Sequence, residues 1–209
     1  MATGGRGIGG KTTRRLEAIV LAAGAGARFG GGKLLAPWRG GMLLDGALAA
    51  AFAAPVRSVS VVWGADAGVA DAARVFAEAA GEAGRLRLIH SPDHALGLSQ
   101  SLKAGIESLS ADAAGVFVFL GDMPRVPAAV FAPMDEALAA GAAAAAPVFA
   151  GQRGHPVLFG AALFPALASL AGDSGAGQLL KSLGDRLVQV AAPDDGVLYD
   201  VDRPGDLPA

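Results

Sequence analysis

The chain of 209 residues contains no cysteine. This absence excludes a disulfide framework, a zinc site built from thiolates and a catalytic thiol. Long apolar runs are also missing, because no stretch approaches the ~20 residues that a membrane-spanning helix needs. The basic N-terminal stretch "MATGGRGIGGKTTRR" has no apolar core after it. We therefore expect no signal peptide, no membrane association and a cytoplasmic location.

The sequence also lacks an excess of charge of one sign. Its 17 basic and 19 acidic residues give a formal net charge of −2, and neither half is strongly polarised. This balance predicts no nucleic-acid-binding surface. The charge balance does not exclude a small anionic ligand, because binding such a ligand needs only a few local cations.

Hydrophobic residues are plentiful at 53%, and their pattern predicts one domain. Residues 1–15 are rich in glycine and cations and are expected to form a flexible N-terminal tail, followed by a single domain over 16–209. Strands are expected over 16–23, 58–64, 85–90 and 115–122, with shorter ones in "AAAAAPVF", "HPVLF" and "DRLVQVAA". Helices are expected over 42–54, 67–80, 98–109, about 127–140, about 161–171 and about 175–184.

Strands that alternate with helices predict an α/β fold of three layers, in which helices flank a mostly parallel sheet. Ligands of such sheets bind beyond the carboxyl ends of the strands. The segments that directly follow each strand are therefore the places to look for a site.

The first such segment, "LAAGAGARFGGGK" (21–33), is a glycine-rich loop with two cations. A dinucleotide-binding interpretation is open, since 24–30 is close to G-x-G-x-x-G and Asp45 follows at a suitable distance. However, Gly30–Gly32 and Pro37 break the helix that this fingerprint requires. A Walker A match at 5–12 has no strand before it. The favoured interpretation is a long phosphate-wrapping loop in which Arg28 and Lys33 neutralise a triphosphate.

Carboxylates follow two other segments. Asp122 ends the apolar run "GVFVFL", where it either caps a turn or holds a divalent cation such as Mg²⁺. Asp200 and Asp202 lie two residues apart in "YDVDRPGDL", where turn chemistry is the alternative. Ser99 and Ser101 begin a predicted helix, as an N-cap or as ligands of a nucleotide.

These motifs together resemble a known family. The segment "LAAGAGARFGGGKLL" is similar to the signature L-A-A-G-x-x-x-R-x-G-x-x-K of nucleotidyltransferases with a Rossmann-like, glycosyltransferase-A-like fold. Within them it more closely resembles the molybdenum cofactor cytidylyltransferases. The motifs "GLSQSLKAG", "LGDMP", "GQRGHPVLF", "GDSGAG" and "YDVDRPGDL" follow in the family's order. The resemblance covers about residues 16–207.

The resemblance implies an enzyme that transfers CMP from CTP to the terminal phosphate of molybdopterin and releases pyrophosphate, with Mg²⁺ as cofactor. It implies Arg28, Lys33 and Asp122 as catalytic residues, and Asp122 with Asp202 as metal ligands. The sequence leaves open whether Asp200 or Asp202 is the second of these ligands. Acceptor-binding residues would be Arg153, His155 and Asp173. The nucleotide would be bound by Leu21, Ala22, Ala23, Gly24, Ala25, Gly26, Arg28, Lys33, Gly97, Ser99 and Ser101.

The resemblance further implies a molybdoenzyme of the xanthine or carbon monoxide dehydrogenase type as a downstream partner. The sequence departs from the family at Gly177, where arginine is common, and this departure weakens the assignment of the acceptor. The alternatives are another phosphorylated acceptor (a sugar phosphate or methylerythritol phosphate), the use of GTP, or a carrier that binds molybdopterin nucleotide without turnover. A nicotinamide-dependent oxidoreductase is the remaining alternative.

Overall fold

The computed structural model describes residues 15–26, 29–172 and 175–207. The expected flexibility of the N-terminal tail therefore concerns residues that lie almost wholly outside the described part. Among the described residues, no helix combines the length and apolar character needed to cross a bilayer.

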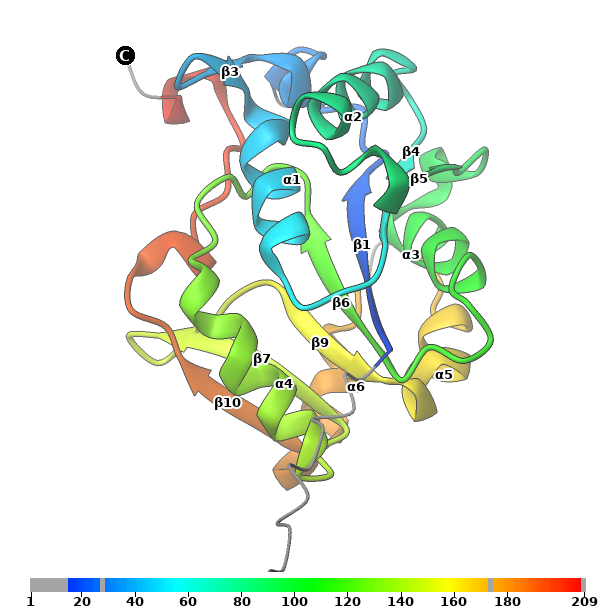
Figure 1. Cartoon of the computed structure of the whole chain (residues 1–209), viewed down its shortest axis with the longest axis vertical. Helices are drawn as coiled ribbons and strands as arrows, with labels where there is room; N and C mark the ends of the chain where they lie inside the picture. Colours follow the sequence, from blue (N-terminus) through cyan, green and yellow to red (C-terminus); the bar gives the residue numbers. More distant parts are fainter. Residues whose placement is uncertain (1–14, 27–28, 173–174, 208–209) are drawn as a thin grey trace, which may run out of the picture.

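A mixed sheet forms the middle layer of the molecule (Figure 1). Its strand order is β10-β7-β9-β6-β1-β4-β5, and β8 pairs with β7. Strands β6, β1, β4 and β5 are mutually parallel, whereas β9 runs antiparallel between β6 and β7. The strands are β1 (Leu16–Ala22), β4 (Val59–Trp63), β5 (Leu86–His90), β6 (Gly115–Leu120), β7 (Ala144–Phe149), β8 (Gln152–Arg153), β9 (Val157–Gly160) and β10 (Leu187–Ala191).

Helices cover both faces of this sheet. In Figure 1, α1 and α4 cross the front of the sheet, and α1, α2 and α4 contribute to one core cluster. Helices α3, α5 and α6 contribute to the cluster on the opposite face. The helices are α1 (Leu43–Ala53), α2 (Gly68–Ala79), α3 (Leu98–Glu107), α4 (Phe131–Ala139), α5 (Phe164–Ala168) and α6 (Gly177–Ser182).

The central strand, β1, is apolar except for Glu17, and its burial explains this composition. In β1 every residue is buried, and alternate side chains enter opposite clusters: Ala18 and Val20 on one face, Ile19 and Leu21 on the other. A strand covered on both faces has no solvent side, so polar alternation is absent. The expected three-layer α/β fold is confirmed.

The predicted element bounds differ from the observed ones mainly in the last third. The helix expected over 161–171 is a 3₁₀ turn, Ala161–Leu163, followed by the short α5, and the helix expected over 175–184 is shortened to α6. The expected strand over 115–122 ends at Leu120, which leaves Asp122 in the turn beyond the sheet. Strand ends of β1 and β6 thereby meet at one edge, because the two strands are parallel neighbours.

Candidate functional site

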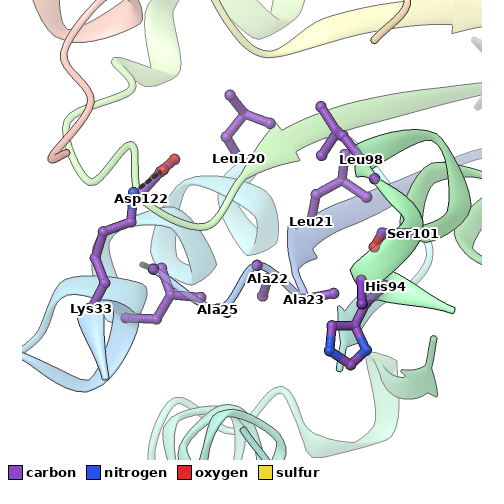
Figure 2. A pocket seen from close by; sticks show the side chains of 15 residues that line it. Leu21, Ala22, Ala23, Ala25, Lys33, His94, Leu98, Ser101, Leu120 and Asp122 are labelled. Atoms are coloured by element: carbon purple, nitrogen blue, oxygen red, sulfur yellow. Dashed lines mark hydrogen bonds and ion pairs between the residues drawn. The ribbon is translucent and has the colours of Figure 1, made fainter. Parts of the chain in front are cut away.

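A cavity of ≈ 490 Å³ lies beyond the carboxyl ends of β1 and β6 (Figure 2). Its walls are the loop after β1, the turn after β6 and the segment that leads into α3. The lining residues are Leu21, Ala22, Ala23, Gly24, Ala25, Gly26, Lys33, Leu34, His94, Ala95, Gly97, Leu98, Ser101, Leu120 and Asp122. The structure thus brings most of the predicted nucleotide-binding residues around one hollow.

Lys33 joins the glycine loop to two carboxylates. Its Nζ lies 2.6 Å from Oδ2 of Asp122, the contact drawn in Figure 2, and 3.6 Å from Oδ1 of Asp202. The side chain of Lys33 is only 14% exposed. Charges that are partly removed from water interact more strongly than surface pairs. The predicted grouping of Lys33, Asp122 and Asp202 is therefore present in the structure.

Glycine is needed for this placement of Lys33. Gly30, Gly31 and Gly32 all have positive φ (93°, 94° and 61°), so the chain turns back and begins a 3₁₀ helix at Lys33. A Cβ on Gly26 would lie 3.0 Å from Cβ of Lys33, and Gly26 also has φ of 60°. Side chains at these positions would strain the loop or displace Lys33.

The C-terminal segment is tied to the turn after β6 by the backbone. The amide of Val201 donates to the carbonyl of Asp122 at 3.2 Å. Asp202 is thereby held next to Lys33, while its own amide donates to Oδ2 of Asp206 at 2.9 Å. The sequence left open which of Asp200 and Asp202 faces the site. The measured contact with Lys33 belongs to Asp202.

Negative charge accumulates at this end of the cavity. Burial raises the pKa of Asp200, and the neighbouring carboxylates of Asp202 and Asp122 raise it further. Within the described residues, no group of three or more His, Cys, Asp or Glu side chains is arranged to hold a metal ion. Asp122 and Asp202 nevertheless face one shared cation, and two carboxylates suit Mg²⁺ when phosphate and water supply the other ligands.

The two serines at the start of α3 differ in their positions relative to the cavity. Ser101 lines the cavity, whereas Ser99 is fully buried and absent from its lining. Ser99 is also no N-cap, because that position is Gly97, whose φ of 119° disfavours any other residue. The Oγ of Ser99 has no hydrogen-bond partner among the described residues.

His94 also lines the cavity. Its Nδ1 lies 3.0 Å from the carbonyl of Ser91, and a carbonyl can only accept, so Nδ1 carries the proton. A Cβ on Gly64 would lie 2.5 Å from Cγ of His94. This close approach between a loop glycine and a ring has no signature in a single sequence.

A second, smaller cavity of ≈ 210 Å³ adjoins the first. Arg153 and His155 line it, as do Leu21, Leu98 and Leu120, which also line the first cavity. The two predicted acceptor residues are therefore next to the candidate nucleotide cavity. Arg28 and Asp173, also predicted site residues, lie outside the described residues.

Two comparisons with known proteins agree with this geometry. Residues 18–188 match the family described as the MobA-like NTP transferase domain. The chain is 28% identical to the molybdenum cofactor cytidylyltransferase of Escherichia coli (strain K12) over 145 residues. This match covers 68% of this chain and 69% of the relative.

Solved structures extend the similarity over nearly the whole chain. A homolog of Rv0371c from Mycobacterium sp. strain JC1 is 31% identical with a TM-score of 0.76, and the match covers 92% of each chain. Rv0371c of Mycobacterium tuberculosis H37Rv is 27% identical with a TM-score of 0.76, covering 93% of this chain and 96% of that one. A structure of Rv0371c in complex with manganese matches at 25% identity and a TM-score of 0.67, covering 87% and 89%.

The resemblance inferred from the motifs is thus confirmed, and the nicotinamide-dependent alternative is set aside by a match to a different nucleotide-binding family. The family match spans the strand that leads into the glycine loop, the turn that carries Asp122 and the second cavity's wall. The chain belongs to the MobA-like NTP transferase domain family of nucleotidyltransferases.

Proposed function

We propose that this protein transfers CMP from CTP to the terminal phosphate of molybdopterin and releases pyrophosphate. The observation that carries the proposal is the pairing of Lys33 with Asp122 and Asp202 at one end of a cavity walled by the glycine loop. Support for the substrate comes from the name of the Escherichia coli relative, a molybdenum cofactor cytidylyltransferase.

The reaction requires the protein to position the two reactants, but it requires no nucleophile from the protein. An oxygen of the acceptor phosphate is already anionic, and it forms the new bond to the α-phosphorus of CTP. The bond from that phosphorus to the bridging oxygen breaks in line, and its electron pair leaves with pyrophosphate. Holding the two reactants in this geometry lowers the entropic part of the barrier.

Lys33 would stabilise the charge that develops on pyrophosphate. Its ammonium lies at the phosphate end of the cavity, and the flanking glycines allow it to turn from the carboxylates toward a phosphate. The amides of the loop 24–26 would approach the same phosphates, since no side chains other than the Ala25 methyl intervene. Preorganised donors of this kind are a large source of catalysis.

Asp122 and Asp202 would hold Mg²⁺. The fit rests on the shared contact of the two carboxylates with the ammonium group of Lys33. When bound, the ion would polarise phosphate oxygens and orient them. The manganese complex of Rv0371c supports divalent metal binding in a related protein.

The second cavity would receive the acceptor. Arg153 supplies a cation at its rim, and burial lowers the pKa of His155, so that its imidazole is neutral. A molybdoenzyme of the xanthine or carbon monoxide dehydrogenase type remains the predicted user of the product.

The proposal is tested by pyrophosphate release with CTP, GTP, ATP and UTP, each combined with molybdopterin, methylerythritol phosphate or a sugar phosphate. We expect turnover with CTP and molybdopterin, a CMP-linked product in the mass spectrum, and loss of turnover with EDTA that Mg²⁺ restores. Turnover with a different pair would identify another nucleotidyltransferase. Tight binding of the dinucleotide without any Mg²⁺-dependent turnover would support a carrier instead.

A further inference from the structure

Asp202 lies on an irregular stretch of chain that follows the last strand and runs from orange to red in Figure 1. From the end of β10 to residue 207, the chain contains only two short 3₁₀ turns. The contact of Asp202 with Lys33 is long, 3.6 Å against 2.6 Å for Asp122, and 47% of the Asp202 side chain is exposed. Such a contact restrains a side chain weakly. The position of Asp202 therefore depends on how the backbone around it is held.

The carboxylate of Asp206 holds this backbone. The amide of Asp202 donates to Oδ2 of Asp206 at 2.9 Å, and the amide of Arg203 donates to the same oxygen at 2.7 Å. The main chain of Asp206 is fixed as well, since its carbonyl accepts the hydroxyl of Tyr199 at 2.7 Å. Three hydrogen bonds thus close the loop 199–206, and those to the ionised carboxylate are of the stronger kind.

The closed loop is anchored to the turn after β6. The guanidinium of Arg125, in that turn, lies 4.6 Å from the ring centre of Tyr199 and donates to Oδ1 of Asp195 at 2.9 Å. The amide of Val201 donates to the carbonyl of Asp122 in the same turn. Asp206 therefore sets the position of Asp202 relative to the segment that bears the other carboxylate.

This restraint is needed most when Lys33 leaves the two carboxylates. Asp122 and Asp202 share the ammonium group of Lys33, which offsets their mutual repulsion. In the proposed function Lys33 turns toward a phosphate, and the repulsion then acts on the more exposed of the two, Asp202. A loop closed by hydrogen bonds resists that displacement. A ligand held in place also binds a cation with less loss of conformational entropy.

We propose that Asp206 is a positioning residue that keeps Asp202 at the cavity for a divalent cation. The inference rests on the proposed function, in which Asp122 and Asp202 hold that ion. Asp206 acts through the amides of Asp202 and Arg203, and it does not itself bind the ion.

The role of Asp206 is tested by cation binding in the absence of nucleotide and acceptor. Mn²⁺, which takes the same oxygen ligands as Mg²⁺, is titrated by electron paramagnetic resonance. Asp206→Ala removes the acceptor, whereas Asp206→Asn loses the charge but keeps an oxygen that can accept both amides. Asp194→Ala is the matched control, because Asp194 is also an exposed aspartate of this stretch and accepts the amide of Gly196 at 2.8 Å.

We expect Asp206→Ala to weaken Mn²⁺ binding about ten-fold, as loss of a group that orients a metal ligand does. Exchange of the Asp202 and Arg203 amide hydrogens, followed by NMR, should become faster. Asp206→Asn and Asp194→Ala should keep the wild-type affinity. In an Asp202→Ala background, Asp206→Ala should cause no further loss, because it acts through Asp202. Thermal unfolding shows that each variant is folded.

Wild-type Mn²⁺ affinity in Asp206→Ala would overturn the inference, and so would a further loss in the Asp202→Ala background. Equal losses in Asp206→Ala and Asp206→Asn would show that the charge acts and not the hydrogen bonds. Failure of the wild-type protein to bind Mn²⁺ would remove both this role and the proposed metal ligands.

Failure of the inference can be told apart from failure of the proposed function. A protein that transfers CMP to molybdopterin, but whose Mn²⁺ affinity is indifferent to Asp206→Ala, keeps the proposed function and loses the inference. A protein that shows the expected Mn²⁺ effects and transfers nothing to molybdopterin keeps the positioning role of Asp206 and loses the proposed reaction.

Discussion

Lys33 connects three parts of the chain that are distant in sequence. It starts from the glycine loop after β1, contacts Asp122 after β6 and reaches Asp202 near the C-terminus. Each partner alone has an ordinary explanation, as a turn residue or a surface charge. Their convergence on one ammonium group is what gives the site its chemistry, because it places opposite charges where phosphates and a divalent ion would meet.

At this scale we predict that Lys33→Ala and Asp122→Asn each lower kcat by ~10²-fold or more, as loss of one preorganised electrostatic group does. Steady-state pyrophosphate release measures the change. Lys103→Ala is the matched control, because Lys103 is an exposed lysine on α3 that pairs only loosely with Glu107 at 3.9 Å. Turnover near the wild-type rate in both site variants would remove Lys33 and Asp122 from the mechanism.

At the scale of elements, α1 is pressed against the turn that carries Asp122. A Cβ added to Gly46 of α1 would lie 2.5 to 2.6 Å from the carbonyl oxygen, Cα and Cβ of Pro124. Backbone atoms cannot swing aside as a flexible side chain can. Gly46 therefore lets the helix approach closely enough to support the turn, and its helix-weakening effect is outweighed by this contact.

We predict that Gly46→Ala destabilises the protein by about 1–3 kcal/mol, the usual cost of overpacking. It should also lower kcat, because the turn that bears Asp122 must shift. Denaturant unfolding and pyrophosphate release measure the two effects. Gly84→Ala is the control, since a Cβ at Gly84 meets nothing within 4 Å. A fully stable and active Gly46→Ala variant would contradict this account of the turn.

At the scale of the whole molecule, one end of β1 borders the cavity and the other end carries a buried ion pair. The carboxyl end opens into the cavity, whereas the other end carries Glu17, which is completely buried. Arg57 donates to Oε1 of Glu17 from Nε at 2.9 Å and from Nη2 at 2.7 Å. Arg57 also pairs with Asp112, which in turn pairs with Arg15. This ion network joins the start of β1 to the segments before β4 and β6.

The network makes stability depend on pH. Burial acts to raise the pKa of Glu17, but hydrogen bonds from Ser110 and Arg57 outweigh it and leave the pKa below 4.5. Hydrogen bonding from Arg57 likewise lowers the pKa of Asp112 to about 2. The unfolded chain therefore binds these protons more readily than the folded one, so stability is present above pH ~4.5 and is lost as the pH falls through the folded-state values.

We predict that Glu17→Gln destabilises the protein by about 3 kcal/mol near neutral pH, since it breaks a buried ion pair. The difference from wild type should shrink as the pH falls below 4.5, the ordinary value of the carboxyl, because protonation of Glu17 then favours the unfolded wild-type chain. Denaturant unfolding between pH 3 and 7 measures both effects. Turnover of the folded variant should be unchanged, because Glu17 lies at the end of β1 opposite the cavity. A difference that stays constant with pH would show that the charge of Glu17 is not what stabilises the fold.

The sequence alone determined the layers of the fold and the loop that forms the site. Apolar strands followed by amphipathic helices specify a covered sheet, and "LAAGAGARFGGGK" specifies a glycine loop with cations, because these are local properties of neighbouring residues. The bounds of the short helices α5 and α6 could not be predicted in this way, because they depend on packing against the sheet.

Only the tertiary structure decided which groups meet. The contact of Asp202 with Lys33 joins residues that are far apart in the chain. Ser99 is buried by the packing of the folded chain, and leucines from separate segments line both cavities. Glu17 appears in the sequence as an ordinary charge at the start of a strand, yet it is buried because Arg57 and Ser110 come to it from other segments. Electrostatics and packing depend on distance in space, and a single sequence records only distance along the chain.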